Sequence, residues 1–474
     1  MRSRRVSSAL LTAAAAALAA PATAAAHGGP IQRNPLPLDP ILFAWGAAAI
    51  LVISFAALAL MWPKPVFEDA RWRPLPIVGR VLGSRVVDFL CGAIGVALLA
   101  VVIVAGYVGP EGAADNLVPT FVMITFWVGL VVLSLIFGDV FKAFNPWRAI
   151  GRAVGAVVGR RGPARRPYPE ALGRWPAAAG LFMFTWIELV GQWADNPVTL
   201  TNAIVGYTVV TLAAQSVWGV ETWTRRGEAF SVYYNFLSRV SPFETRDRVL
   251  GVRKVLGGLP KIDPVAGTVP VLMVMIGTVT FDGLSQGDLW NSVGPWLTDD
   301  VFGALGADAT TAGKLADTVG LLAGVGFVAG FYWLGMEGAR SVGGNIPAPT
   351  LRRAFVHTLV PIAAAYVMAH YLSYLLYEGQ AIQYLAADPF GQGWDIFGTA
   401  DAAIDFSLLS QNAVWYLQYG FVVTGHVAAL ILAHDRALVT YGQASQAVRS
   451  QYWMLAIMVG FTMLALWLLR QAGL

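Results

Sequence analysis

Charged residues are scarce along this chain. Only 13% of its 474 residues are Asp, Glu, Lys or Arg, whereas 57% are hydrophobic. Soluble domains carry roughly 25% charged residues, because charge keeps a water-exposed surface soluble. The composition therefore excludes an ordinary soluble protein.

Cysteine and recognisable catalytic motifs are also lacking. Cys91 is the only cysteine, so no intrachain disulfide and no cysteine-based metal cluster can form. The chain has five histidines but no HExxH zinc motif, and it has neither a P-loop nor a nucleophile elbow. No short motif decides the chemistry, so a site must be sought among isolated polar residues.

Long apolar runs recur along the whole chain. A helix needs about 20 mostly apolar residues to cross a hydrocarbon core of about 30 Å. Ten segments meet this need: 41–62, 86–108, 118–137, 176–193, 200–218, 267–283, 316–336, 355–377, 411–432 and 452–469. The sequence therefore predicts an all-α fold, a polytopic membrane bundle of about ten transmembrane helices.

The first 26 residues predict a secretory signal peptide. MRSRR is a basic start, SSALLTAAAAALAA is a short apolar stretch, and PATAAA supplies small residues for cleavage. Cleavage after Ala26 would make His27 the mature N-terminus, at the start of an exterior segment over 27–40, whereas cleavage after Ala24 would not. A free N-terminal histidine can chelate a metal ion through its amine and its ring, so His27 is a candidate metal ligand.

The distribution of Lys and Arg predicts the topology. With the mature N-terminus outside, alternate loops face the cytoplasm: 63–85, 138–175, 219–266, 337–354 and 433–451. These loops hold 26 of the 32 Lys and Arg residues, as the positive-inside rule requires. Both termini are then outside. Because the basic residues are spread beside the spans, the pattern does not favour nucleic-acid binding.

The predicted domains are two five-helix halves, 41–218 and 267–474, joined by the loop 219–266. An odd number of spans inverts the second half, as in many transporters, but no residue-level similarity decides whether the halves are a repeat. In the loop, RRGEAFSVYYNFLSRVSPFE predicts an amphipathic helix on the inner membrane surface, with Ser241–Glu244 as a capping box. In FNPWRAIGR, Asn145 is predicted to cap a second such helix.

Four ionisable residues lie well inside predicted spans: Glu188, Asp282, His370 and His426. Such residues usually face a bundle interior or a water-filled cavity. At about 1.5 Å per residue, Glu188 lies roughly 18 Å above the inner end of its span, and Asp282 and His370 roughly 22 Å. These three are predicted to share one level, with His426 deeper, some 10 Å from the inner face.

Each of these residues belongs to a polar stripe at helical spacing. The stripes are Thr185, Glu188, Gln192 and Asp195; Thr278, Asp282 and Ser285; Tyr366, His370, Ser373 and Tyr377; and Asn412, Tyr416, Tyr419 and His426. Together they predict a cavity open to the exterior with His426 near its floor. The alternative is that each polar residue is paired within an ordinary helix–helix contact.

Several chemistries suit these groups. Glu188, Asp282 and His370 are suitable ligands for Zn²⁺, Mn²⁺ or Fe²⁺, and a metal so held turns bound water into a nucleophile. Without a metal, the same groups can act as general base and acid. They can also form a proton relay for transport.

Several segments are together similar to those of a known protein family. The leader ending in AHGGP and the segments LFAWGAA, GDVFKAFNPWRAIGR, GEAFSVYYNFLSRVSPFE and MIGTVTFDGLSQG resemble bacterial multi-span membrane proteins labelled fenitrothion hydrolase. The similarity extends over most of the chain. It implies hydrolysis of an organophosphate triester in a bacterial plasma membrane. The recurrent TFDG of that family includes Asp282.

The leading prediction is therefore a membrane-embedded hydrolase in which Glu188, Asp282, His370 and His426 act on a small lipophilic phosphotriester or similar ester. A neutral substrate fits, because no Lys or Arg within the spans is placed to clamp a phosphate dianion. The alternative is a transporter or metal-handling protein that uses the same residues as a relay or transit site. A third possibility is an assembly component of the bilayer without chemistry of its own.

Overall fold

The computed structural model describes residues 40–68, 70–157, 165–342 and 346–471. The predicted signal peptide, the segment 27–39 and His27 lie outside the described residues. Within them the chain is almost entirely helical, so the all-α prediction is confirmed.

Eight helices are long and apolar enough to cross a membrane, or nine if one bent pair counts as a single span, within the described residues. The eight are α2 (Pro40–Met61), α4 (Arg85–Val108), the run formed by α5 (Leu117–Pro119), η1 (Thr120–Gly129) and α6 (Leu130–Phe137), α10 (Pro197–Trp218), α13 (Thr268–Ser285), α15 (Ala309–Arg340), α20 (Gln411–Tyr441) and α21 (Ala444–Gln471). The protein is thus a multi-pass membrane protein by length and composition of its helices.

Two of the predicted spans differ from straight membrane helices. The predicted span 355–377 falls in the bent pair, whose two parts meet at 57°. The first part consists of α16 (Ala348–Phe355), η5 (Val356–Leu359) and α17 (Val360–His370). The second part consists of α18 (Leu372–Leu376), η6 (Glu378–Ala381) and α19 (Ile382–Ala387). The predicted span 176–193 is α9 (Trp175–Leu189), which has only 15 residues and is followed by η2 (Trp193–Asp195). The count of ten spans therefore stays a prediction.

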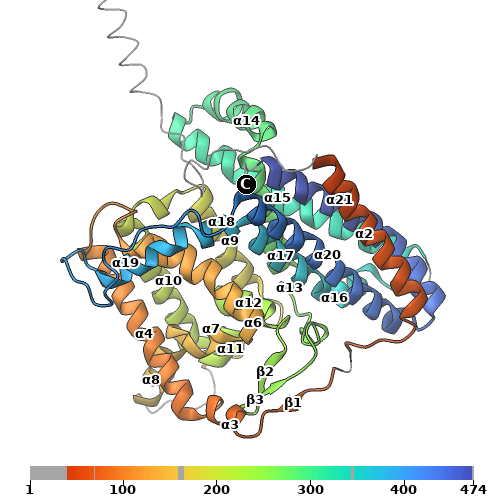
Figure 1. The fold of residues 1–474 in the computed structure, drawn as a ribbon, viewed down its shortest axis with the longest axis horizontal. Helices are drawn as coiled ribbons and strands as arrows, with labels where there is room; N and C mark the ends of the chain where they lie inside the picture. The colour runs from red at the N-terminus through yellow and green to blue at the C-terminus, as the bar shows by residue number, and fades with distance from the viewer. Residues whose placement is uncertain (1–39, 69, 158–164, 343–345, 472–474) are drawn as a thin grey trace, which may run out of the picture. The chain divides into compact units, whose positions relative to one another are not determined.

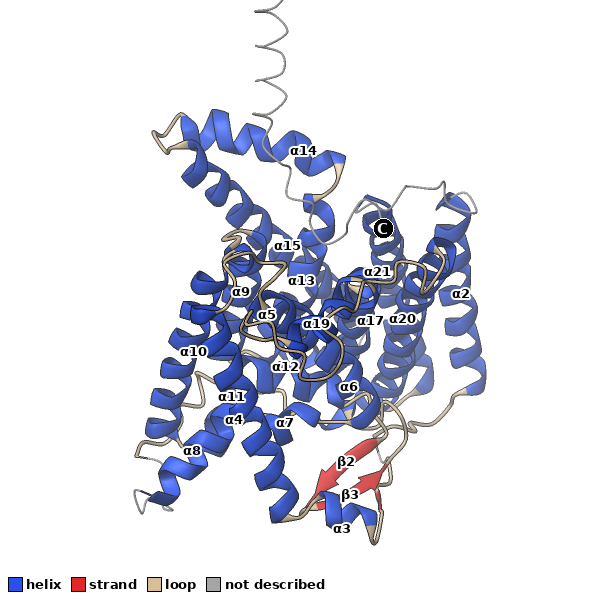
Figure 2. Ribbon diagram, turned by 60° about the vertical axis from the view of Figure 1, so that its left-hand side comes forward, coloured by secondary structure: helices blue, strands red, loops and turns tan. Residues whose placement is uncertain are grey.

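The remaining elements are short. The helices are α3 (Val78–Leu82), α7 (Val140–Phe144), α8 (Pro146–Val157), α11 (Val220–Arg226), α12 (Ala229–Ser238), η3 (Leu259–Lys261), α14 (Asp288–Pro295) and the π-helix η4 (Trp296–Gly303). The strands β1 (Arg73–Pro74), β2 (Phe243–Arg246) and β3 (Val249–Val252) form an antiparallel sheet of order β1-β3-β2, with Arg73 opposite Val252 and Phe243 also opposite Val252. Figure 2 shows this sheet and α14 at opposite ends of the long helices.

The five loops predicted to be cytoplasmic lie at one end of the bundle. Strand pairing joins 63–85 to 219–266, and Asn145 Nδ2 donates to Glu228 across 138–175 and 219–266. The backbone amide of Phe67 donates to Asp435, and the Tyr441 hydroxyl donates to the carbonyl of Ala339. Contacts thus join all five basic loops at one end of the bundle, as expected if successive spans cross the membrane in alternate directions. The side of the membrane that these loops face stays a prediction.

The prediction for the loop 219–266 is wrong in part. Its helix α12 does not lie on a surface, because nine of its ten residues are buried among the surrounding helices. Ser241–Glu244 caps no helix: the Ser241 hydroxyl donates to the carbonyl of Ile136, and the chain enters strand β2. The spacing of aromatic and polar residues predicted a surface helix, but a buried helix with aromatic residues on all its faces can show the same spacing. The predicted cap at Asn145 is confirmed, since its side chain accepts from the amide of Arg148.

Helix α13 is the central helix of the bundle. Buried residues make up 78% of its span, against 28–50% for the other seven. It packs against α9, α15, α17 and α21, and Figure 1 shows it in the interior. Gly277 permits the close approach to α15, because a Cβ there would lie 2.4 Å from the Cα of Val325. A polar residue on α13 is therefore held away from lipid.

Candidate functional site

Asp282 of α13 is the centre of a buried polar cluster. Its Oδ2 lies 2.9 Å from Nε2 of His370 and accepts a 2.7 Å hydrogen bond from the hydroxyl of Tyr371. The side chain of Asp282 is 1% exposed and that of His370 is 11% exposed, and Tyr371 is buried. The structure therefore brings together Asp282 and His370, two of the residues proposed from depth, and adds a tyrosine to them.

A break in the helix explains why two neighbouring residues reach one carboxylate. Helix α17 ends at His370, and α18 begins at Leu372 after a bend of 57°. In a straight helix the side chains of successive residues point about 100° apart. The irregular backbone at Tyr371 (φ −97°, ψ 13°) lets both side chains turn toward α13. Breaks of this kind occur at membrane depth only where protein or a cavity surrounds them.

Tyr371 is held from the other side by aromatic packing. Its ring lies 4.9 Å from that of Trp127, which in turn packs against Phe184 at 4.9 Å. Trp127 belongs to η1, a π-helical stretch of ten residues. Long π-helical stretches are rare and often occur near functional sites. Irregular backbone therefore lies on two sides of the Tyr371 ring: at the helix break that carries Tyr371 and in η1, which carries Trp127.

Glu188 lies close to this cluster. It is buried on α9, and its carboxyl group lies within electrostatic range of the hydroxyls of Tyr371 and Tyr374. The predicted stripe from Thr185 to Asp195 is wrong, because α9 ends at Leu189 and Gln192 adopts a left-handed conformation with φ 55°. The predicted stripe requires a helix that continues to Asp195, whereas the helix ends at Leu189.

His426 lies next to Tyr366 rather than next to Asp282. It is completely buried on α20, and its Nδ1 lies 2.8 Å from the carbonyl oxygen of Val422. The ring centroids of His426 and Tyr366 are 6.4 Å apart. Tyr366 precedes His370 by one turn of α17. Nε2 of His426 and the hydroxyl of Tyr366 are both buried without a hydrogen-bond partner among the described residues.

A small cavity lies beside His370 and Tyr366. It has a volume of ≈ 20 Å³ and is lined by Tyr366 and His370 together with residues of α13, α20 and α21. About 10–15 Å³ suffices for one water molecule when polar groups surround it. The unsatisfied hydroxyl of Tyr366 and the imidazole of His370 are such groups. The cavity is therefore large enough for one water molecule beside His370 and Tyr366.

The predicted metal ligands do not form a complete set. Among the described residues no three His, Cys, Asp or Glu side chains are grouped so that they could hold a metal ion. Asp282 and His370 supply two suitable donor groups. The third predicted ligand from the spans, Glu188, does not complete a set of three with them, and His27 lies outside the described residues. Binding of Zn²⁺, Mn²⁺ or Fe²⁺ stays a prediction.

The sequence offered little signal for Tyr371. Stripes at spacings of three and four connect His370 with Tyr366 and Ser373, and they place Tyr371 on another face of the helix. An aromatic residue directly beside a candidate histidine does not indicate a site unless the helix is known to break there.

The comparisons with known proteins found no matching family model, no matching curated protein and no matching solved structure.

Proposed function

We propose that this protein is a proton-linked membrane transporter of a small cation, with Asp282 as the group at which a proton and the cation compete. The observation that carries the proposal is the cluster of Asp282, His370 and Tyr371 at the break between α17 and α18. Many transporters form their substrate and ion sites at discontinuous helices, and here such a break lies beside the carboxylate of Asp282 in the last turn of α13.

The partners of Asp282 support this role. A buried carboxylate is costly unless its charge is compensated. The imidazole of His370 can take up or release a proton, and the phenol of Tyr371 donates a hydrogen bond without adding charge, so neither partner is a fixed positive charge like that of an arginine. A proton or a small cation can therefore supply the compensating charge, and exchange of one for the other gives coupling.

The size of the adjoining cavity favours proton and cation traffic over hydrolysis of a large ester. A cavity of ≈ 20 Å³ beside His370 holds about one water molecule, whereas sites for drug-sized ligands occupy ~300 Å³ or more. Water in this cavity extends the path from His370 to Tyr366 and then toward His426. The proposed relay thus leads from the Asp282 cluster toward the end of the bundle that holds the basic loops. We take this end to be the cytoplasmic one and the membrane to be a bacterial plasma membrane.

The experiment uses purified protein in liposomes that contain a pH-sensitive dye. Gradients of Na⁺, Mg²⁺, Mn²⁺ and Zn²⁺ are imposed in turn, and proton movement is recorded. We expect at least one cation to drive protons in the opposite direction, and Asp282→Asn to abolish the signal. Asp317→Asn is the matched control, because this half-buried aspartate of α15 bonds only to Trp290 among the described residues. No proton movement with any of the four cations contradicts the proposal.

Hydrolysis of a lipophilic phosphotriester is the second candidate. The 2.9 Å contact of His370 with Asp282 is the pairing by which a carboxylate orients a histidine that acts as general base. The resemblance to proteins labelled fenitrothion hydrolase points the same way. Turnover of a nitrophenyl dialkyl phosphate by the purified protein in detergent, lost in His370→Ala, favours this candidate, and absence of turnover with intact proton coupling removes it.

A further inference from the structure

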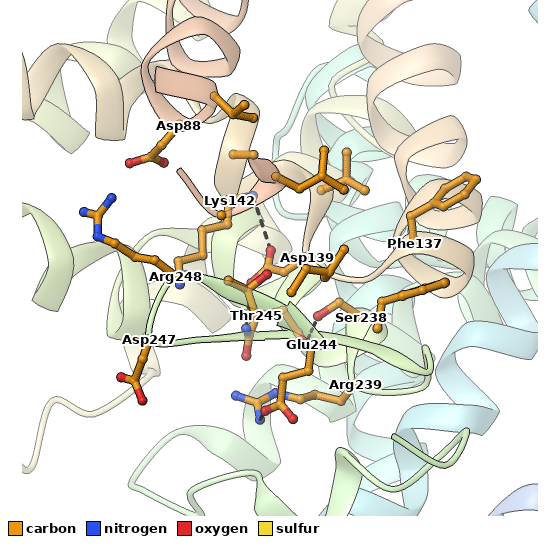
Figure 3. A pocket seen from close by; sticks show the side chains of 18 of the residues that line it. Asp88, Phe137, Asp139, Lys142, Ser238, Arg239, Glu244, Thr245, Asp247 and Arg248 are labelled. Atoms are coloured by element: carbon orange, nitrogen blue, oxygen red, sulfur yellow. Dashed lines mark hydrogen bonds and ion pairs between the residues drawn. The ribbon is translucent and has the colours of Figure 1, made fainter. Parts of the chain in front are cut away.

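The end of the bundle that carries the sheet contains a hollow unrelated to Asp282. Two cavities, of ≈ 370 Å³ and ≈ 440 Å³, share the lining residues Asp139, Lys142, Asn235 and Arg239. Figure 3 shows the first between α7 and the β2–β3 hairpin, with Lys142 and Asp139 on the helix side and Thr245, Asp247 and Arg248 on the hairpin side. The two cavities are therefore neighbours that share a wall, and together they are called the trough below.

The larger cavity has an excess of positive charge. Its basic lining residues are Lys142, Arg174, Arg225, Arg226, Arg239 and Lys261, against three acids, Asp139, Glu221 and Asp263. The acids already have partners. Asp263 pairs with Arg226 at 3.2 Å, Glu221 pairs with arginines of α8 outside this cavity, and Asp139 accepts hydrogen bonds from Lys142 N and Asn235 Nδ2.

Two of the cations are free to meet a ligand. Among the described residues, the side chains of Lys142 and Arg225 form neither an ion pair nor a hydrogen bond, and both are exposed. Within the described part of the chain, the Arg239 side chain makes a single long contact, of 4.0 Å, with Glu244. These three side chains line one cavity from α7, α11 and the end of α12. They come from separate elements and converge.

Arg174 is the one buried residue among the basic residues that line the larger cavity. It is only 7% exposed, and its Nη1 donates to the carbonyl of Asp263 at 2.5 Å and to Thr268 Oγ1 at 2.7 Å. Its guanidinium lies over the ring of Phe236 at 5.0 Å, and its Nε is buried without a hydrogen-bond partner among the described residues. A buried cationic N–H without an acceptor is costly, so this position favours an anion.

The electrostatics agree with a site for negative charge. Burial lowers the pKa of Arg174 to about 10, against the opposing effect of Asp263 and with help from Arg226 and Arg239. Burial and the positive charge of Arg246 lower the pKa of Lys261. Cations that destabilise one another in this way are relieved when an anion binds among them.

We infer that this trough binds a phosphate group, carried either by an anionic lipid headgroup or by a soluble phosphate compound. Phosphate offers several acceptor oxygens that match the donors of Arg and Lys. Basic pockets beside membrane helices are the usual sites of such headgroups. Simple sorting of basic residues to one membrane face explains exposed side chains, but it does not explain why they converge on a cavity with a buried arginine.

The test measures binding to purified full-length protein in neutral detergent, with two probes, dioctanoyl phosphatidylglycerol and inorganic phosphate. We expect saturable binding of at least one probe and a loss of about tenfold or more in the Lys142→Ala/Arg225→Ala double variant. Both side chains are exposed, so the fold should persist, and a thermal melt checks this. Arg353→Ala is the matched control, because it removes an exposed cation of α16 from outside the trough.

The outcomes separate the two sources of phosphate. If the lipid binds and inorganic phosphate does not, the ligand of the trough is a lipid headgroup. If inorganic phosphate binds, the trough is open to soluble phosphate compounds. Equal weakening by Arg353→Ala overturns the proposal, because it shows attraction to overall charge only. Absence of binding by both probes also overturns it.

Discussion

Glu228 and Asp282 are both carboxylates buried in this membrane protein, but their partners differ in kind. Glu228 caps α12 and accepts five hydrogen bonds, from the backbone amides of Phe230 and Ser231, the Ser231 hydroxyl, Asn145 Nδ2 and the Tyr207 hydroxyl. Three of these donors hold α12 and one holds the start of α8. The carboxylate of Glu228 is therefore part of the scaffold.

The partners of Asp282 instead belong to a break in a helix. His370 and Tyr371 approach it from the junction of α17 and α18, and an imidazole beside a carboxylate can exchange a proton with it. The same contrast separates two histidines of α20. His434 contacts Gln451 and the carbonyl of Trp62 through its two ring nitrogens, whereas Nε2 of His426 has no partner among the described residues. Glu228 and His434 are held by partners that fix the fold, whereas Asp282 lies beside an imidazole that can exchange a proton and His426 keeps one ring nitrogen without a partner among the described residues.

The sharpest way to break this comparison is Asp282→Asn. The amide keeps the shape of the side chain but cannot exchange a proton, so we expect cation-driven proton flux to fall by about 100-fold or more. The melting temperature should stay within a few degrees of the wild type. Flux that persists at a tenth of the wild-type rate contradicts the assignment of Asp282.

Glu228→Ala tests the scaffold side of the comparison. Removal of the carboxylate leaves several buried donors unsatisfied, and each costs about 1–3 kcal/mol. We expect a loss of about 3 kcal/mol or more in stability, seen as a large drop in melting temperature or in the yield of folded protein. Glu337→Ala is the control, because this partly exposed residue pairs with Arg340 at the surface and should cost under about 1 kcal/mol.

Tyr371→Phe removes a single hydrogen bond to Asp282. A hydrogen bond to a charged group contributes about 1.5–3 kcal/mol, so flux should fall by roughly tenfold or more, while the ring still packs against Trp127. The pH dependence of the flux should shift as well, since Asp282 loses a donor that stabilises its ionised form. Unchanged flux with an unchanged pH profile shows that Tyr371 only packs.

The relay predicts a smaller and non-additive effect. Tyr366→Phe and His426→Gln should each lower flux by about threefold to tenfold, and the double variant should lose little more, because both act on one path. His434→Gln should instead lower the melting temperature without a specific effect on flux. Multiplied losses in the double variant place the two residues on separate paths.

The smallest expected effect concerns Glu244 at the sheet end. Although burial opposes it, the guanidinium groups of Arg246 and Arg253 hold the pKa of Glu244 below its usual value. A depressed pKa contributes stability above the unfolded value of about 4.3, and this contribution is lost as pH falls. Melting temperature should therefore drop between about pH 5 and pH 3, and Glu244→Gln should flatten that part of the curve.

Much of the fold was predictable because hydrophobic length and charge sorting are strong signals. They predicted the helical class, the positions of most spans and the loops that meet at one end. The burial of α12 and the strands were not predicted. An aromatic-rich segment has the same periodicity whether it faces lipid headgroups or neighbouring helices. The short β2–β3 hairpin turns at Asp247 and Arg248, which have positive φ without the glycine that usually marks such a turn.

The candidate site was predictable in part for a similar reason. Depth along ideal helices brought Asp282 and His370 to one level, where the structure joins them. The same ideal helices misplaced Gln192 and overlooked Tyr371, because each lies where a helix stops. A break depends on what surrounds the backbone, and the local sequence around Tyr371 carries neither glycine nor proline to announce it.

The most direct test of the account is the protonation state of Asp282 itself. Infrared difference spectra of the purified protein, recorded before and after the addition of the cation that drives proton movement in liposomes, report carboxylic acid groups that lose a proton. The account predicts a carboxylic acid band that disappears when the cation binds and that is missing in Asp282→Asn. A spectrum without such a band, or the same band in the Asp282→Asn protein, contradicts it.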